Sequence, residues 1–469
     1  MEKEIVIGKY TLESLTSGMY SNPLDLYREY IQNAVDSIDN AKEIYKEVEY
    51  YISIEIDELE GSIAIKDNGT GISQKNAGKI LVDIGNSGKD KKKARGFRGI
   101  GRLAGLGYSD KLSFVTSCEG EAVKTIVHFN TKLLKRLLYE EDKNIISVDD
   151  VMQEIVEICE EVEEKEKHYF KVLLEGIEIK EKLLDAKIVE NYLVQCAPLP
   201  YDREFVWGDV IKKKFQSSGY IIPEYKIVLN GKKLYKPYHN TFICDRVKRR
   251  EETIHDVDVI PFYREDKLTG VLWYGVTGYC GTILDNTIKG IRIRQGNILI
   301  GDKTTCNKLF KEERFNGWLM GEFYIIDPEM IVNARRDYFE ENEAHYDFSE
   351  NFLMWSTKII KEIKKISYSK YLSDKKCDDF ENKNLRKEKI HSECDLIKKE
   401  ENEEVTILDK FSWLINDKEE RKTKYLALNM KDNLTLVEKK TLEKTFDIII
   451  GEYNRKDAEK IINIIINKI

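Results

Sequence analysis

The sequence predicts an α/β protein, because helical and strand patterns alternate along much of the chain. Residues 27–41, YREYIQNAVDSIDNA, repeat apolar side chains at helical spacing and predict an amphipathic helix. Residues 50–67 alternate isoleucine with polar residues around a Glu60-Gly61 turn, which predicts a β-hairpin. A second strand-rich stretch covers about residues 185–345. Two successive α/β regions are therefore expected.

Further elements follow from the same patterns. Strands are expected at residues 111–117, 122–129 and 170–179, and within EYKIVLNGKKL, GVLWYGVTGYC, IRIRQGNILI and LMGEFYIID. Residues 131–167 read as a charged helical insert, and residues 365–404 as a solvated helix or linker. The predicted parts are a first α/β domain (1–182), a second (183–348), a charged helical linker (349–404) and a short helical C-terminal segment (405–469).

Composition and cysteine usage favour a cytoplasmic protein. The net charge of −8 combines 76 basic with 84 acidic residues, so local patches of either sign remain possible in an acidic chain. Eight cysteines form no CxxC pair and six histidines show no metal-ligand spacing, which predicts free thiols and no structural zinc. The N-terminus lacks the pattern of a signal peptide, and no apolar stretch reaches the length of a membrane span.

The helix at residues 27–41 carries an unusual polar face. Glu29, Asn33, Asp36 and Asn40 lie at i, i+4, i+7 and i+11, opposite the apolar stripe. A solvated surface is the ordinary interpretation of such a face. This one has no lysine or arginine and none of the Glu/Lys pairs typical of an exposed helix. Two carboxylates and an amide in a row therefore raise the alternative of a ligand site.

Three short motifs occur in a fixed order along the first region. They are ExxxN (Glu29, Asn33) on the helix, DxGxG (Asp67, Gly69, Gly71) after a strand, and GxxGxG (Gly96, Gly99, Gly101) at the end of a basic loop. Together they resemble the GHKL ATPase superfamily, which includes gyrase, the ninety-kilodalton heat-shock chaperone, histidine kinases and MutL. The resemblance implies a Bergerat-type α/β sandwich, a mixed sheet with helices on one face, and ATP with Mg²⁺ as ligands.

The resemblance also implies roles for the polar face. Asn33 would contribute an oxygen ligand to a magnesium ion that bridges the phosphates. Glu29 would orient and deprotonate the attacking water. Asp36 would either support these two side chains or contact the nucleotide through water.

Adenine recognition falls to the DxGxG motif. Asp67 would accept a hydrogen bond from the adenine amino group, which guanine lacks at that position. Gly69 and Gly71 would let the backbone approach the base. Family members usually add a late threonine on a core strand, but the matching stretch here, residues 168–177, contains none. Another group or a water must complete the contacts around Asp67.

The glycine-rich lid would bind the phosphates. Backbone N–H groups at a helix start would meet the triphosphate there. Individual lysines of the KDKKKAR run are more simply explained as a solvated loop. The expected phosphate contacts are Gly96, Gly99 and Gly101, with Ser87, Lys89 and Arg98 as additions.

The second region indicates the branch of the superfamily. Residues 318–340, WLMGEFYIIDPEMIVNARRDYFE, are similar to a middle-domain segment of the ninety-kilodalton heat-shock chaperone, whose arginine reaches the ATP site. By position Arg336 matches that arginine, with Arg335 as the close alternative. A forked, permanently charged donor suits the charge that develops on the γ-phosphoryl group. The resemblance covers about residues 5–345 and also extends to MutL and MORC proteins.

The sequence is therefore consistent with three alternative functions. The leading one is a slow, Mg²⁺-dependent ATPase of the chaperone-like branch, an ATP-promoted homodimer that acts on a protein client or partner subunit. An ATP-gated nucleic-acid clamp is the alternative, motivated by basic clusters at residues 91–95, 212–214 and 246–250. A regulatory ATPase subunit of a bacterial defence complex is a third. The C-terminal helices would form a dimer interface, dock a partner or pack on the middle domain.

Overall fold

A computed structural model gives the fold of this chain. It describes residues 7–15, 22–45, 48–84, 101–139, 147–178 and 181–393. The backbone divides into two compact units, residues 1–376 and 377–469, and the first unit contains the three sheets of the described residues, two large ones and a two-stranded ribbon.

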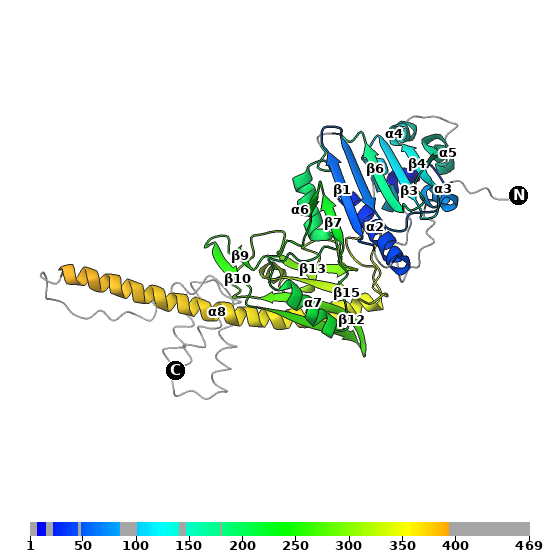
Figure 1. The fold of residues 1–469 in the computed structure, drawn as a ribbon. Helices are drawn as coiled ribbons and strands as arrows, with labels where there is room; N and C mark the ends of the chain where they lie inside the picture. Colours follow the sequence, from blue (N-terminus) through cyan, green and yellow to red (C-terminus); the bar gives the residue numbers. More distant parts are fainter. Residues whose placement is uncertain are drawn as a thin grey trace. The chain divides into compact units, whose positions relative to one another are not determined.

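The first sheet has eight strands in the order β5-β4-β3-β6-β2-β1-β7-β8 (Figure 1). It is mixed, because β7 runs parallel to β1 whereas the other neighbours are antiparallel. Its strands are β1 (Tyr51–Asp57), β2 (Ser62–Asp67), β3 (Lys111–Ser117), β4 (Val123–Asn130), β5 (Val156–Val162), β6 (Tyr169–Glu175), β7 (Lys226–Leu229) and β8 (Lys232–Lys233).

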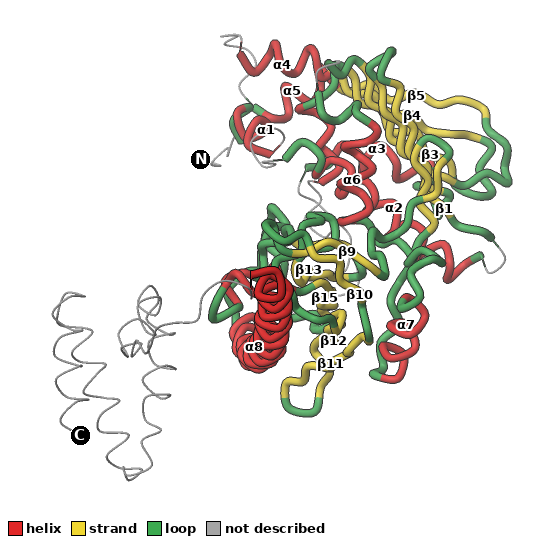
Figure 2. The backbone as a smooth tube through the Cα atoms, turned by 90° about the vertical axis from the view of Figure 1, so that its left-hand side faces the viewer, coloured by secondary structure: helices red, strands yellow, loops and turns green. Residues whose placement is uncertain are grey.

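Helices cover one face of this sheet (Figure 2). They are α1 (Tyr10–Leu15), α2 (Asp25–Ile44), α3 (Gln74–Val82), α4 (Thr131–Tyr139), α5 (Val148–Ile155), α6 (Ala186–Cys196) and the 3-10 helix η1 (Gly101–Gly107). The apolar stripe of α2 packs in one core with the inward side chains of β1 and β2, such as Ile52 and Ile65. The predicted mixed sheet with helices on one face is therefore confirmed.

The second sheet lies between two helical layers. Its five strands, in the order β11-β12-β15-β13-β14, are β11 (Asp256–Arg264), β12 (Lys267–Val276), β13 (Gly290–Gln295), β14 (Ile298–Ile300) and β15 (Met320–Ile325). On β12, Leu272 and Tyr274 belong to the core shared with α8 (Glu343–Glu393). The alternate residues Val271 and Trp273 face the core shared with α7 (Gly208–Ser217). The second predicted α/β region is therefore also present.

The remaining elements include strands that the sequence patterns did not predict. They are the hairpin β9 (Thr241–Cys244) and β10 (Arg250–Thr253) and the edge strand β11. Two short 3-10 helices, η2 (Asn307–Leu309) and η3 (Glu313–Trp318), complete this region. The helical prediction for residues 131–167 is wrong over β5, which pairs with β4. Because β5 is an exposed edge strand rich in glutamate, no burial pattern marked it in the sequence.

The path of the chain between the sheets bears on the predicted parts. β7 and β8, from within residues 183–348, extend the first sheet, and α8 continues across residue 348. The four-part division stays a prediction, and its last part, residues 405–469, lies outside the described residues. None of the described helices combines the length and apolar character needed to cross a bilayer.

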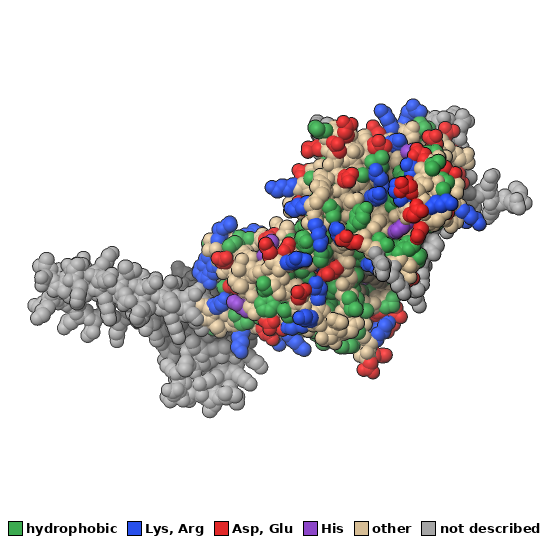
Figure 3. All heavy atoms as spheres, in the orientation of Figure 1, with side chains coloured by type: hydrophobic (Ala, Val, Ile, Leu, Met, Phe, Trp, Pro, Cys, Tyr) green, Lys and Arg blue, Asp and Glu red, His purple; other side chains and the backbone are tan. Residues whose placement is uncertain are grey.

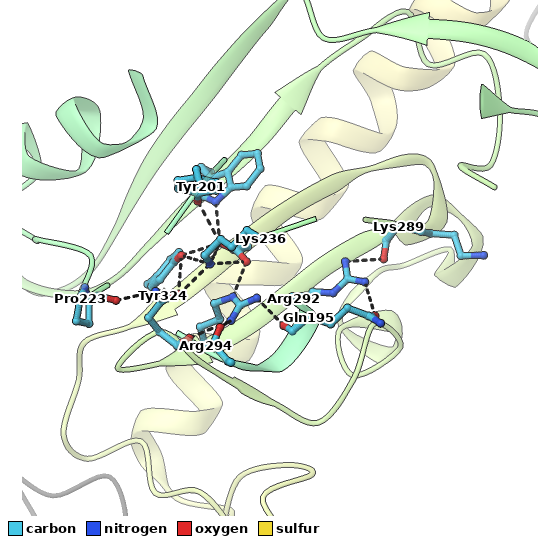
Figure 4. A network of polar contacts seen from close by, with 12 residues as sticks. Gln195, Tyr201, Pro223, Lys236, Lys289, Arg292, Arg294 and Tyr324 are labelled. Atoms are coloured by element: carbon cyan, nitrogen blue, oxygen red, sulfur yellow. Dashed lines mark hydrogen bonds and ion pairs between the residues drawn. The ribbon is translucent and has the colours of Figure 1, made fainter. Parts of the chain in front are cut away.

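A buried charged network ties α6 to the second sheet (Figure 4). Arg294 Nη2 donates to the Gln195 carbonyl at 2.6 Å, near the C-terminal end of α6, and Arg294 Nε donates to Glu322 Oε1 at 2.5 Å. Lys236 Nζ donates to Glu322 Oε2 at 2.7 Å. Burial and the nearby Arg294 lower the pKa of Lys236 to about 7. Because α6 packs in the first core, this network anchors one sheet to the other.

Candidate active site

The polar face of α2 is enclosed by protein. The helix is continuous from Asp25 to Ile44, so Glu29, Asn33 and Asp36 lie on one face. Glu29 and Asp36 are buried and Asn33 is half-buried, whereas Asn40 at the end of the row is exposed. A solvated face therefore does not describe the first three of these positions.

Asp67 lies at the end of β2, beside α2. Its side chain is 2% exposed, and its Oδ1 accepts a hydrogen bond from the Gly69 backbone N–H at 2.9 Å. Burial raises the pKa of Asp67 from its ordinary 3.8 to about 7, while the bonds from Gly69 and the Ser37 side chain oppose that rise. Ser37 could not be recognised from the sequence, because a serine on a helix carries no signal that it faces a buried carboxylate.

The strand beside Asp67 offers no threonine. Phe170 of β6 stands opposite Asp67 in the register, and no residue of β6 is a threonine. Ser37 is the hydroxyl residue that the structure does place beside the carboxylate. The hydroxyl group beside Asp67 therefore comes from α2 rather than from a threonine of the sheet.

The two glycines of the DxGxG motif are required by their surroundings. Gly71 has a φ of +64°, and a Cβ there would overlap the Ser117 and Tyr169 carbonyl oxygens. A Cβ at Gly69 would overlap the Ser37 side chain. The loop thus runs against β3, β6 and α2 without side chains of its own at these positions.

The segment after the lid packs directly on α2. Tyr30 Oη accepts from the Gly105 N–H at 2.9 Å and donates to the Arg102 carbonyl at 3.0 Å. At Gly101 a Cβ would overlap the Glu29 carboxylate, so a larger residue would require the Glu29 side chain to move. The other lid residues expected to contact phosphate lie outside the described residues: Ser87, Lys89, Gly96, Arg98 and Gly99.

A loop of the second α/β region reaches the same face of α2. Arg336 Nε lies 2.9 Å from Glu29 Oε1. The neighbouring Arg335 has an exposed side chain, and only its carbonyl makes a contact here, from Arg28 Nη2 at 3.2 Å. Of the two arginines that the sequence left open, Arg336 is the one whose guanidinium lies against the site.

The Arg336 loop is held in shape by its own hydrogen bonds. Asn333 Nδ2 donates to Asp337 Oδ1 at 2.6 Å, and the Asn333 carbonyl accepts from the Arg336 N–H at 3.1 Å. The Arg336 carbonyl accepts from the Gly301 N–H at 2.8 Å. Arg336 has a φ of +57°, a left-handed conformation that costs a non-glycine residue about 1 kcal/mol. These bonds fix a strained residue beside Glu29.

The polar atoms of the site fit a nucleotide with a hard cation. Glu29, Asn33 and Asp36 offer oxygen atoms, the ligands that Mg²⁺ prefers. Gln32 is 1% exposed, yet neither atom of its amide has a hydrogen bond, and Glu29 Oε1 meets Arg336 only as an ion pair. The described residues contain no group of three or more His, Cys, Asp or Glu placed to hold a metal. A magnesium ion here would take its remaining ligands from phosphates and water.

Comparison with known proteins agrees with this geometry. Residues 26–164 match a family model described as "Histidine kinase-, DNA gyrase B-, and HSP90-like ATPase". The match runs from α2 through β5, and it supports a GHKL-type ATPase domain in this part of the chain. No curated protein matches the sequence.

Proposed function

We propose that this chain binds ATP with Mg²⁺ on α2, β2 and η1, hydrolyses it slowly, and uses the cycle to drive a chaperone-like conformational change. The observation that carries the proposal is the Arg336–Glu29 ion pair. This ion pair joins the polar face of α2 to a loop of the second α/β region. Binding of ATP at α2 would therefore affect both regions.

Adenine is recognised by Asp67 in this proposal. A carboxylate that is already enclosed by Gly69 and Ser37 accepts the hydrogen bond of the adenine amino group. Gly71 keeps the neighbouring backbone close, and guanine would bring a carbonyl oxygen against the carboxylate. The site therefore selects adenine through the hydrogen bond to the Asp67 carboxylate and through the limited space around the base.

Changing Asp67→Asn tests this assignment. A charge-assisted hydrogen bond contributes about 1.5–3 kcal/mol, so the variant should bind ATP about 10- to 100-fold more weakly at pH 8. Because the pKa of Asp67 is about 7, wild-type affinity should also fall from pH 8 to pH 6 as the carboxylate takes up a proton. Isothermal titration at both pH values measures this, with the nucleotide's own titration common to both proteins. Equal affinity and an equal pH response in the two proteins would remove Asp67 from the pocket.

The raised pKa of Asp67 also affects the stability of the ATP-free protein, which should change with pH in the opposite direction to the affinity for ATP. The folded state holds the Asp67 proton up to about pH 7, whereas the unfolded chain releases it near pH 3.8. The contribution of Asp67 to stability is therefore full below pH 3.8 and is lost as the pH rises through about 7. At pH 8 the Asp67→Asn protein should accordingly melt at a higher temperature than the wild type in the absence of ATP.

Hydrolysis divides between the two regions. Glu29 orients and deprotonates the attacking water, and Asn33 would help to hold a magnesium ion, with Asp36 on the same face. Magnesium, when bound, would offset charge on the phosphate oxygens. Arg336 leaves Glu29 and donates to the γ-phosphoryl oxygens, which frees the carboxylate to act as a base.

This exchange of partners supports a conformational cycle. The Arg336 loop follows β15 directly, and the Arg294–Glu322 network connects β15 to α6. A change at Glu29 can thus reach the second sheet through two connections, the Arg336 loop and the contact of α6 with β15. We propose that the resulting movement, with lid closure, brings two copies together and acts on a protein client or partner subunit.

ATP-promoted dimerisation tests the conformational part of the proposal. The Glu29→Ala protein should trap bound ATP, so with ATP and Mg²⁺ it should run as a dimer in size-exclusion chromatography with light scattering. With ADP, or with ATP and a chelator, it should run as a monomer. A protein that binds ATP yet keeps one mass in every nucleotide state would contradict ATP-promoted dimerisation.

A nucleic-acid clamp is the second candidate function, and one observation favours it. The basic cluster at residues 246–250 lies on an exposed turn, and none of the ion pairs of the described residues involves Arg246, Lys248 or Arg249. By contrast, Lys212 and Lys214 of the cluster at residues 212–214 pair with nearby carboxylates.

A further inference from the structure

The turn between β9 and β10 presents three cations to solvent. Arg246, Lys248 and Arg249 are all exposed, and blue side chains gather at the edge of the second α/β region where Figure 1 places this hairpin (Figure 3). Asp245 fixes the turn by accepting from the Val247 and Lys248 N–H groups at 2.8 and 3.2 Å. Asp245 and Arg249 have φ values of +61° and +44°, so the turn has a defined shape.

Two further lysines lie beside this turn. The Asp245 N–H donates to the Thr282 carbonyl at 2.9 Å, the side chains of Thr282 and Lys289 both lie beside Gly317, and the Lys303 carbonyl lies beside Gly290. Burial, and then the like charges of Lys303 and Arg246, lower the pKa of Lys289. Asp285 opposes this lowering, and its Oδ1 also accepts from the Thr287 N–H at 2.8 Å, while Asp302 Oδ1 accepts from the Thr304 N–H at 2.7 Å. Like charges held together in this way repel each other and favour the binding of an anion.

The contrast with the other basic cluster is informative. Lys212 lies 3.3 Å from Asp209 and 3.6 Å from Glu224, and Lys214 lies 3.7 Å from Asp256. Those lysines belong to a surface balanced by carboxylates. Arg246, Lys248 and Arg249 take part in no ion pair among the described residues, and Asp245 is the carboxylate within their turn, although the two clusters look alike in the sequence.

The chemistry of this surface fits phosphate groups in series. Protein interfaces usually centre on apolar and aromatic side chains and are depleted in lysine, but Val247 is the only large apolar side chain exposed on this turn. Arginine and lysine on separate segments suit the regularly spaced charges of a nucleic-acid backbone. A two-stranded ribbon such as β9–β10 is also narrow enough to enter the major groove of a duplex.

We propose that Arg246, Lys248 and Arg249 of the β9–β10 turn, with Lys289 and Lys303 beside them, form a binding surface for the phosphate backbone of a nucleic-acid duplex. The inference rests on the second candidate function and identifies its contact surface. Binding would be independent of sequence, since the cations offer no fixed pattern of paired donors and acceptors to base edges.

Fluorescence anisotropy with the full chain tests the surface. The triple variant Arg246→Gln, Lys248→Gln, Arg249→Gln is compared with Lys212→Gln, Lys213→Gln, Lys214→Gln, which loses the same charge. Labelled DNA and RNA duplexes of random sequence are titrated from low salt upward. The turn variant should bind at least about 10-fold more weakly, and its slope of log affinity against log salt should fall by about 3. The control variant should stay within about 2-fold of the wild type.

Each of the following outcomes would contradict the proposal that this turn binds a nucleic-acid backbone. Absence of duplex binding by the wild type at low salt removes it, as does equal weakening in both triple variants. Equal binding of an acidic peptide or of anionic vesicles at the same salt shows a general anion surface instead. Thermal unfolding checks that each variant folds, and Arg246→Gln alone, with an expected slope change of about 1, serves if the triple variant does not. Measuring ATP hydrolysis distinguishes failure of this inference from failure of the proposed ATPase function. A wild type that hydrolyses ATP but binds no duplex contradicts this inference alone.

Discussion

Replacing Arg336 by alanine should lower the ATP turnover rate by about 10³- to 10⁵-fold, the range for an arginine that stabilises charge on a transferred phosphoryl group. The affinity for ATP should change little, because this contact forms most strongly in the transition state. Single-turnover hydrolysis with saturating ATP measures the rate, and equilibrium binding measures the affinity.

Arg335→Ala is the matched control for this experiment. It removes the same charge from the adjacent position, but its side chain is exposed and its carbonyl contact with Arg28 is retained. Its turnover should remain within a few-fold of the wild type. Similar losses in the two variants would mean that loop shape or net charge matters, and not the guanidinium that lies 2.9 Å from Glu29.

Replacing Glu29 by alanine should abolish most turnover while leaving ATP bound. A general base contributes about 10²- to 10⁴-fold, and that is the expected loss. The variant also removes the ion pair between Arg336 and Glu29 in the free protein, which should favour transfer of the guanidinium to the nucleotide. ATP affinity is therefore expected to be equal to or higher than that of the wild type. A Glu29→Ala protein with wild-type turnover would assign the base to another residue.

Much of the first sheet follows from local sequence patterns. The strand expected at residues 111–117 is β3 itself, and the hairpin at residues 50–67 is β1 and β2. β1 and β2 bury alternate side chains, so apolar and other residues alternate in their sequences. β5 and β11 lie at sheet edges, and β9 and β10 form an isolated ribbon. β5 has no buried residue and needs no such alternation, which is why its sequence did not mark it.

The site was readable where the chemistry restricts the residue type. Acidic and amide groups on one face of α2, and glycines that touch other backbones, are visible in a sequence. Ser37 and Gln32 were missed, because both are common on helices and only packing shows that they meet buried groups. The choice between Arg335 and Arg336 depended on tertiary packing, which places the Arg336 guanidinium against Glu29 and leaves the Arg335 side chain exposed.

Steady-state ATP hydrolysis by the wild type beside Glu29→Ala, with ATP binding measured on the same samples, tests the central claim most directly. Slow turnover by the wild type that requires Mg²⁺ and is lost in Glu29→Ala, with ATP bound by both, is the predicted result. ATP bound equally by both proteins but hydrolysed by neither, or at the same rate by both, would contradict a catalytic site on α2.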